Sequence, residues 1–370
     1  RRNIVHIRKS EHKMIKKECF TAEWIEQVSS ELHYNDKNLI EKVIRALSLL
    51  EMLVKAGCPL VFKGGTALML ILGKSAHRLS IDIDLICPPG TNIEDYLKSF
   101  ADFGFINLEL VERKQRDDAD IPKSHSKFFY QIAYRNDTDA QSYILLDVLY
   151  EDIHYFRTQQ IAINCPFIRL EGKPLMVTVP SAEDILGDKL TAFAPNTTGI
   201  PYYKNGRSCS MEIAKQLYDV GRLFENVSDL QITKEAFRKI AVVELSYRSF
   251  GTDIGQVFND IRQTALCIST RGKAGEGDFD LIQDGIIRVK SFMYKQRYLI
   301  DHAIIDAARA AYLATLIEKG INEIESYSNN PADIKDMVIR PSLPNKLNKL
   351  RSNLPEAYYY WAKTSELLEA

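Results

Sequence analysis

Apolar residues in the first part of the chain recur with helical spacing. Across residues 21–55 they return every three or four positions, which predicts helices. A Gly-Cys-Pro sequence at 57–59 ends this stretch, because proline does not continue a helix. The apolar run 60–62 then predicts a short strand. Two glycines follow it, and the residues after them predict a helix over 66–72.

Apolar and polar residues alternate from Leu79 to Ile86, which is the periodicity of a half-buried strand. A Pro-Pro-Gly sequence directly after it ends the strand. We expect a short helix over 93–101, and further strands over 105–111, 127–134, 143–150 and 161–168. This part of the chain therefore predicts a mixed sheet with helices packed on it.

Helical periodicity takes over after Pro180. Ser181, with Asp184 three residues later, predicts a helix start, because a serine at this place can accept a hydrogen bond from the first turn. Strands gathered in one part and helices in the next are typical of α+β folds. We expect a lobe with the mixed sheet at 1–180 and a mostly helical lobe at 181–370.

Composition narrows the class of protein. The 370 residues are 45% hydrophobic and 26% charged, and 48 Lys and Arg almost balance 49 Asp and Glu. This is the profile of a globular protein, and near-neutrality leaves room for a local basic patch that binds nucleic acid. The six cysteines form no Cys-x-x-Cys pair and predict reduced thiols in the cytoplasm. The sequence has no apolar run of membrane-spanning length, so we expect no membrane partner. The basic stretch up to Lys17 is a basic arm or an ordinary solvated terminus.

The first candidate for chemistry is the pair Asp82 and Asp84. Two residues apart on a strand, both carboxylates project from one face and repel each other unless a cation lies between them. Mg²⁺ prefers such oxygen ligands, so the pair predicts a magnesium site. Two solvated acids on an edge strand are the alternative.

The second candidate is the turn Gly64-Gly65-Thr66, between the predicted strand and the predicted helix. Backbone N–H groups at a helix start can hold a phosphate oxygen, glycine allows close approach, and the Thr66 hydroxyl adds a donor. A simple tight turn is the alternative. The order of strand, glycine turn, helix and paired-acid strand is more specific than either motif alone.

Asp147 is the third acid. It lies in the middle of an apolar strand, where a carboxylate is costly to bury unless it is paired or bound to a metal. In two-metal phosphoryl transfer such an acid serves as metal ligand and as general base toward the attacking hydroxyl. A structural hydrogen bond or an ion pair with an arginine is the alternative.

Four ordered segments resemble the AbiEii/AbiGii toxin branch of the DNA polymerase β-like nucleotidyltransferases. They are Phe-Lys-Gly-Gly-Thr-Ala-Leu at 62–68, Arg-Leu-Ser-Ile-Asp-Ile-Asp-Leu at 78–85, Asp-Lys-Leu-Thr-Ala at 188–192 and Lys-Gln-Leu-Tyr-Asp-Val at 215–220. The resemblance implies a polymerase-β-like nucleotidyltransferase fold. It also implies a toxin of a toxin–antitoxin or phage-defence pair, with a cognate antitoxin as partner.

The same resemblance implies transfer of NMP from NTP to an RNA acceptor, such as the 3′ end of tRNA, with Mg²⁺ as cofactor. Carried over by position, Gly64, Gly65 and Thr66 bind the triphosphate, and Asp82 and Asp84 bind the metal. Lys189 neutralises phosphate charge, as a point charge can. Asp219 either positions a basic residue such as Lys189 or contacts substrate. The assigned catalytic residues are Asp82, Asp84, Asp147, Lys189 and Asp219, and the metal ligands are Asp82, Asp84 and Asp147.

Other polar residues have both a functional and a structural interpretation. Arg78 and Ser80 join the nucleotide-binding set, although Arg78 could instead pair with Asp84. Two clusters combine basic and aromatic residues, as RNA-binding surfaces do, although an ordinary surface is the simpler explanation. They are Lys123, His125, Lys127, Phe128 and Phe129, and, in a loop expected over 195–207, Tyr202, Tyr203, Lys204 and Arg207. The aromatic run Tyr358-Tyr359-Tyr360-Trp361 predicts helix packing rather than an RNA platform.

Two other functions use the same residues. The acceptor could be a small molecule, such as an antibiotic, or a protein hydroxyl. The protein could also bind nucleotide and titrate a partner protein without transferring anything. Retention of the carboxylates and of Lys189 argues against the last alternative, because a pure binder has little use for a paired metal site.

Overall fold

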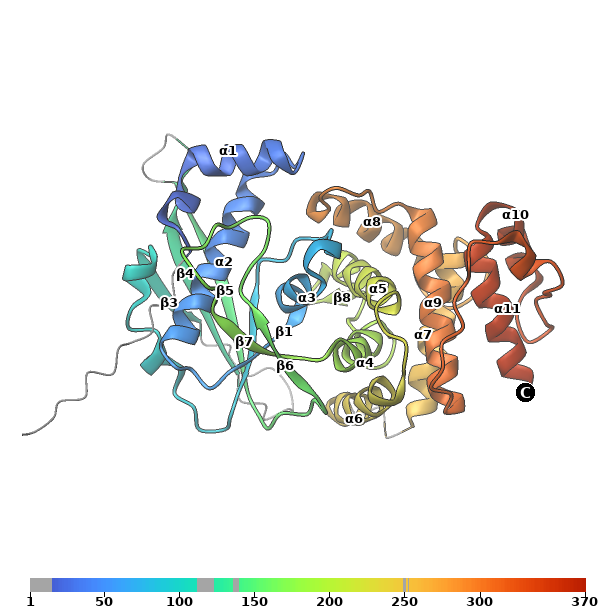
Figure 1. Cartoon of the computed structure of the whole chain (residues 1–370). Coiled ribbons are helices and arrows are strands. Elements are labelled where there is room, and N and C mark those ends of the chain that lie inside the picture. Colours follow the sequence, from blue (N-terminus) through green and yellow to red (C-terminus); the bar gives the residue numbers. More distant parts are fainter. Residues whose placement is uncertain (1–14, 112–122, 136–139, 249–250, 252) are drawn as a thin grey trace, which may run out of the picture. The chain divides into compact units, whose positions relative to one another are not determined.

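The structure is a computed structural model that describes residues 15–111, 123–135, 140–248, 251 and 253–370 (Figure 1). The contacts of the chain divide it into two units. Of the described residues, the first unit contains 15–111, 123–135, 140–152 and 160–179, and the second contains 153–159 and all those from 180 onward. Most of the basic N-terminal stretch lies outside the described residues.

A five-stranded mixed sheet forms the centre of the first unit. Strands β2 and β5 are parallel, and the other neighbours are antiparallel. This confirms the expected α+β class with a mixed sheet. In order across the sheet, the strands are β1 (Val61–Lys63), β2 (Ile83–Cys87), β5 (Gln141–Tyr150), β4 (Lys123–Gln131) and β3 (Asn107–Val111).

Three helices accompany this sheet: α1 (Ala22–Glu31), α2 (Lys37–Lys55) and α3 (Gly64–Leu72). Helix α2 packs against β5, and its apolar positions from Leu39 to Leu53 are buried. The Asp36 side chain begins α2 by accepting a hydrogen bond from the Leu39 backbone. Every residue of α2 from Val43 to Leu53 is buried, the polar ones included, so the helix is enclosed on all sides rather than along one apolar face.

Several strands differ from the expected ranges. The alternating stretch 79–86 pairs as a strand only from Ile83, and directly before it the Asp82 carbonyl accepts a hydrogen bond from the Thr66 hydroxyl. The strand expected over 127–134 runs over 123–131, and the one expected over 161–168 is β6 (Thr158–Ala162). The expected helix over 93–101 is two short 3-10 turns.

The second unit is mainly helical. Its central helix α9 contacts α5, α7 and α11, and its buried alanines let these neighbours approach closely. The helices are α4 (Ala182–Ala192), α5 (Ser210–Phe224), α6 (Gln231–Tyr247), α7 (Ile254–Ser269), α8 (Phe279–Val289), α9 (Ile300–Lys319), α10 (Leu350–Asn353) and α11 (Pro355–Glu369). Two small sheets complete the fold, β6 with β7 (Met176–Pro180) and β8 (Tyr203–Lys204) with β9 (Arg207–Ser208). Within the described part of the chain, no helix is both long and apolar enough to cross a membrane.

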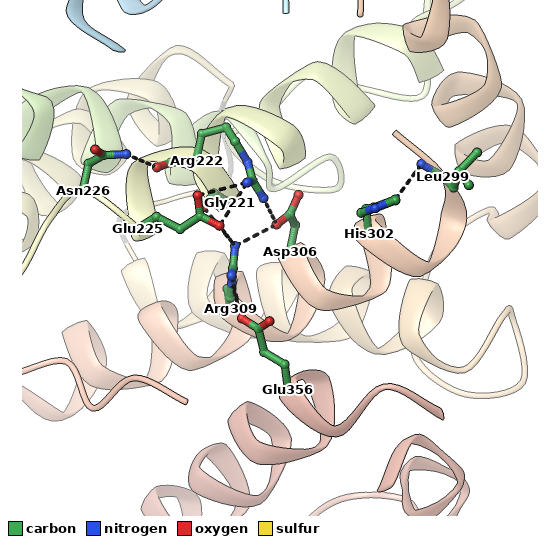
Figure 2. A network of polar contacts seen from close by, with 9 residues as sticks. All are labelled: Gly221, Arg222, Glu225, Asn226, Leu299, His302, Asp306, Arg309 and Glu356. Carbon is green, nitrogen blue, oxygen red and sulfur yellow. Dashed lines mark hydrogen bonds and ion pairs between the residues drawn. The ribbon is translucent and has the colours of Figure 1, made fainter. Parts of the chain in front are cut away.

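A buried ion network joins α5, α9 and α11 (Figure 2). Asp306 is fully buried, and its carboxylate accepts hydrogen bonds from Arg222 at 3.0 Å and from Arg309 at 3.3 Å. Arg309 also binds Glu356 of α11, at 3.0 Å through Nε. Burial raises the pKa of Asp306, although both guanidinium groups act in the opposite direction. A Cβ at Gly221 would lie 2.0 Å from an Asp306 oxygen, so this network requires glycine on α5.

Candidate active site

The glycine turn is the junction between β1 and α3. Gly64 has a φ of +78°, a left-handed conformation that glycine adopts without strain. A Cβ at Gly64 would lie 2.1 Å from the Asp84 carboxylate oxygen Oδ2, so glycine is also needed for space. The turn and the second acid of the pair are therefore packed directly against each other.

Helix α3 begins at Gly64, two residues earlier than expected, so both glycines lie in its first turn. The N–H groups of a first turn have no partner within the helix and can bind an anion. The Thr66 hydroxyl donates to the Asp82 carbonyl at 2.7 Å, and Thr66 is fully buried. The hydroxyl thus holds the turn to the acidic segment, which differs from its expected role as a phosphate donor.

Arg78 and Ser80 line the same turn. A Cβ at Gly65 would lie 2.7 Å from Ser80 Oγ and 2.9 Å from Arg78 Nη2. Arg78 is buried, and its Nη1 donates to the Leu79 carbonyl at 3.1 Å. Both side chains of the predicted nucleotide-binding set are therefore brought against the helix start.

A row of polar side chains crosses the sheet at the level of the turn. Asp84 lies opposite Asp147 on the neighbouring strand, and Asp147 lies opposite His125 on the next. Residues in register on adjacent strands point to the same face of a sheet. The row, which we call the acid row, consists of Lys63, Asp84, Asp147 and His125 on β1, β2, β5 and β4.

His125 is hydrogen bonded to Asp147 through Nδ1 and Oδ1. The histidine is buried, whereas the side chain of Asp147 is 36% exposed. Asp147 therefore has a partner on one side and solvent access on the other. This is the arrangement of a carboxylate that is held in place and can still be reached by a substrate.

Among the described residues, no group of three or more His, Cys, Asp or Glu side chains is arranged to hold a metal ion. The ligand set of Asp82, Asp84 and Asp147 stays a prediction, and Asp147 is hydrogen bonded to His125. Magnesium needs only one or two protein carboxylates when substrate phosphates and water supply the other ligands. The donor set of Asp82 and Asp84 fits that requirement.

The second unit contains the other predicted pair. Lys189 on α4 lies with its Nζ 2.9 Å from Oδ2 of Asp219 on α5, and both side chains are buried. Of the two roles left open for Asp219, this contact supports the positioning of Lys189. Helix α4 is itself capped as expected, because the Ser181 side chain accepts a hydrogen bond from the Asp184 backbone.

The two predicted RNA-binding clusters differ in structure. The first lies on β4 and is divided between the faces of the sheet: His125 faces Asp147, and Phe128 is buried against Phe105. It therefore forms no continuous surface. The second lies on the β8–β9 hairpin, where Tyr203, Lys204 and Arg207 are exposed.

His125 and Lys63 are the residues of the acid row whose place the sequence does not reveal. His125 appears in the sequence only as a member of a basic and aromatic cluster, and Lys63 only as a letter of the glycine motif. Both are placed by strand register, which depends on pairing between segments far apart in the chain. Residues 123–127 are all polar, so no local alternation marks the face on which His125 lies.

Comparison with known proteins gives one family. The chain matches the model of the nucleotidyl transferase AbiEii toxin, type IV toxin–antitoxin system, over residues 47–330. No curated protein matches. Similar solved structures include JHP933 from Helicobacter pylori, with 17% sequence identity and a TM-score of 0.41. A second is an H. pylori protein described as a candidate nucleotidyltransferase, with 18% sequence identity and a TM-score of 0.37. Each comparison covers 76% of this chain and 94% of the other. Since the family model spans more than half of the sequence, the chain belongs to the AbiEii nucleotidyl transferase toxins of type IV toxin–antitoxin systems.

Proposed function

We propose that this protein transfers a nucleoside monophosphate from an NTP to a hydroxyl of an RNA acceptor, such as the 3′ end of tRNA, with the help of Mg²⁺. The observation that carries the proposal is the acid row beside the glycine turn. It combines an anion-binding helix start with carboxylates at the same end of the sheet. Nucleotidyl transfer requires this combination, because it depends on positioning and charge neutralisation more than on covalent chemistry.

The glycine turn would hold the triphosphate. Backbone N–H groups at the start of α3 have no partner within the helix and would bind phosphate oxygens, and the helix dipole favours negative charge there. Arg78 adds a guanidinium beside Gly65, which can bind phosphate oxygens in a forked geometry. The triphosphate would thus be bound mainly by backbone groups and one arginine.

The reaction forms one bond and breaks one. The acceptor hydroxyl oxygen attacks the α-phosphorus, and the bond from that phosphorus to the bridging oxygen of the β-phosphate breaks. Pyrophosphate leaves with the bonding electrons, and the proton of the hydroxyl goes to a carboxylate oxygen of Asp147. A magnesium ion held by Asp82 and Asp84 would neutralise the charge of the phosphates when bound.

The resemblance to the family assigns Lys189 of the second unit to the neutralisation of phosphate charge. A buried ammonium is held in one position more firmly than an exposed one, and Asp219 fixes it from α5. The exposed tyrosine and basic residues of the β8–β9 hairpin support RNA as acceptor, because such residues stack on bases and bind phosphates.

The test is incubation of purified protein with each labelled NTP, Mg²⁺ and total tRNA. We expect label on RNA and release of pyrophosphate. The Asp82→Ala/Asp84→Ala variant should lose transfer, whereas Glu94→Ala/Asp102→Ala should keep it. The control removes two exposed acids from the same unit.

Other results would point elsewhere. Label on a small molecule or on a protein hydroxyl would replace RNA as the acceptor. Binding of NTP without pyrophosphate release would indicate a protein that titrates a partner. Transfer by the Asp82→Ala/Asp84→Ala variant at the wild-type rate would overturn the assignment of the site.

A further inference from the structure

A cavity lies in the second unit, at the N-terminal end of α9. Its volume is about 450 Å³. The end of α7 with the turn after it forms one wall, and the segment leading into α10 forms the opposite wall. Ile304 and Leu350 contribute aliphatic surface between them. We call this cavity the α9 pocket.

Four cationic side chains line the α9 pocket: Arg271, Lys273, Lys346 and Lys349. All four are exposed. Asp301 also lines it and is paired with Arg271 at 2.9 Å, which leaves an excess of three positive charges on the lining. Like charges gathered around one hollow repel each other, and a polyanion that enters removes this repulsion.

The walls of the α9 pocket are held together by hydrogen bonds to neutral groups, which do not neutralise the positive charges of the lining. The Lys346 ammonium donates to the Lys273 carbonyl and thereby ties one wall to the other. Behind the pocket, the Trp361 indole donates to Ser269 Oγ at 3.0 Å, and the Thr270 hydroxyl bonds the loop at Ala274. The backbone that carries Arg271 and Lys273 is thus held in place by contacts with α7 and α11.

The chemistry of the lining favours a phosphate backbone over bases. Aliphatic and cationic residues line the pocket, and no aromatic side chain is among these described lining residues. Stacking of bases needs aromatic faces, whereas phosphate contacts need cations and are independent of sequence. Lys346 and Lys349 lie beyond residue 330, where the match to the family model ends. One wall of the pocket is therefore built by a part of this chain that the family model does not describe.

We propose that the α9 pocket binds the phosphate backbone of the acceptor RNA, at a site additional to the one that carries the chemistry. The identity of the RNA as acceptor rests on the function proposed above, whereas the binding itself can be measured without transfer. The pocket adds affinity for RNA in general and leaves the choice of NTP unchanged.

The test compares two double variants of the full chain. Lys273→Gln/Lys349→Gln removes two charges from the pocket, and Lys290→Gln/Lys319→Gln removes two exposed charges that do not line it. Binding of fluorescein-labelled tRNA is measured by anisotropy between 50 and 300 mM KCl, without NTP. We expect the pocket variant to bind about ten-fold more weakly at low salt. The dependence of log K on log salt should become shallower by roughly 1 to 2.

The outcomes separate the two proposals. Equal tRNA affinity and equal salt dependence in both double variants would overturn the pocket proposal, while transfer of label by the wild type would leave the proposed function intact. Weaker binding confined to the pocket variant, with no label on RNA from the wild type, would support the pocket as an RNA site and overturn the proposed reaction. NTP affinity serves as a check of folding and should be the same in all three proteins.

Discussion

At the scale of single residues, the candidate site depends on Gly64 having no side chain. The missing side chain allows the left-handed backbone and leaves room for the Asp84 carboxylate against the helix start. Thr66 adds a second tie through its hydrogen bond to the Asp82 carbonyl. The start of α3 and the acidic segment are thus fixed to each other by two residues of one turn.

Gly64→Ala should abolish nucleotidyl transfer. Its Cβ would collide with Asp84, and alanine in a left-handed conformation costs about 1–2 kcal/mol. Gly57→Ala is the matched control, because Gly57 has a φ of +76° and nothing within 4 Å of a Cβ. Both variants should lose stability in urea unfolding, Gly64→Ala more because of the collision, but only Gly64→Ala should lose activity. Equal activity of the two would contradict the close packing of Gly64 on Asp84.

His125 should act as a positioning residue for Asp147. We expect His125→Leu to lower kcat by about ten- to a hundred-fold without changing the KM for NTP, as when other partners of site residues are removed. His125→Asn should recover part of the loss, because its amide can donate to the same carboxylate oxygen. Steady-state kinetics of both variants test this. A leucine variant as active as the asparagine variant would show that the hydrogen bond is dispensable.

At the scale of elements, each group of site residues depends on how two neighbouring elements are joined. In the first unit, parallel pairing of β2 with β5 sets Asp84 opposite Asp147. In the second, packing of α4 on α5 brings Lys189 to Asp219. The same helix α5 needs Gly221 for its close approach to Asp306 (Figure 2). Short motifs on separate elements become pairs only through these contacts.

Removal of one partner from the Lys189–Asp219 pair should destabilise the protein. Asp219→Leu leaves a buried ammonium without its carboxylate, and the loss of one member of a buried pair costs about 3–5 kcal/mol. Lys189→Met/Asp219→Leu, which removes both charges, should regain most of this stability but not activity. Urea unfolding of both single variants and the double variant gives the coupling energy. Additive losses would show that the pair does not act as a unit.

At the scale of the whole molecule, each unit contains buried carboxyl groups away from the site. Burial raises the pKa of Glu41 and Glu51 in the first unit and of Asp260 and Asp306 in the second. Hydrogen bonds oppose the rise in pKa at all four, and cations do so at Glu41, Glu51 and Asp306. Ionisation of these groups therefore costs stability in the folded protein.

Glu51→Gln tests this cost. Above pH 4.5, the ordinary value for this carboxyl, the unfolded chain has released the proton whereas folded Glu51 retains it until its raised pKa is reached. The free energy of unfolding of the wild type therefore falls as pH rises through this window. Glutamine does not titrate and can still accept from the Ile15 backbone, as Glu51 does at 3.0 Å. The variant should gain stability relative to the wild type between pH 4 and pH 7 in urea unfolding. A constant difference would contradict the raised pKa.

Local sequence patterns determine the secondary structure and the family of this protein. The mixed sheet, the helical part after Pro180, the cap at Ser181 and the family are all predicted from the sequence and confirmed. The aromatic run 358–361 packs in α11 as expected. These features depend on residues close together in the chain, whose periodicity and turn chemistry act locally.

Tertiary structure decided which residues meet. In the folded protein His125 is hydrogen bonded to Asp147, the Thr66 hydroxyl donates to the Asp82 carbonyl, and Lys189 pairs with Asp219. Strand register and helix packing set these contacts, and both depend on apolar burial between distant segments rather than on the polar residues themselves. The strand expected from Leu79 is likewise limited by its pairing, which begins at Ile83 with β5 and at Asp84 with β1.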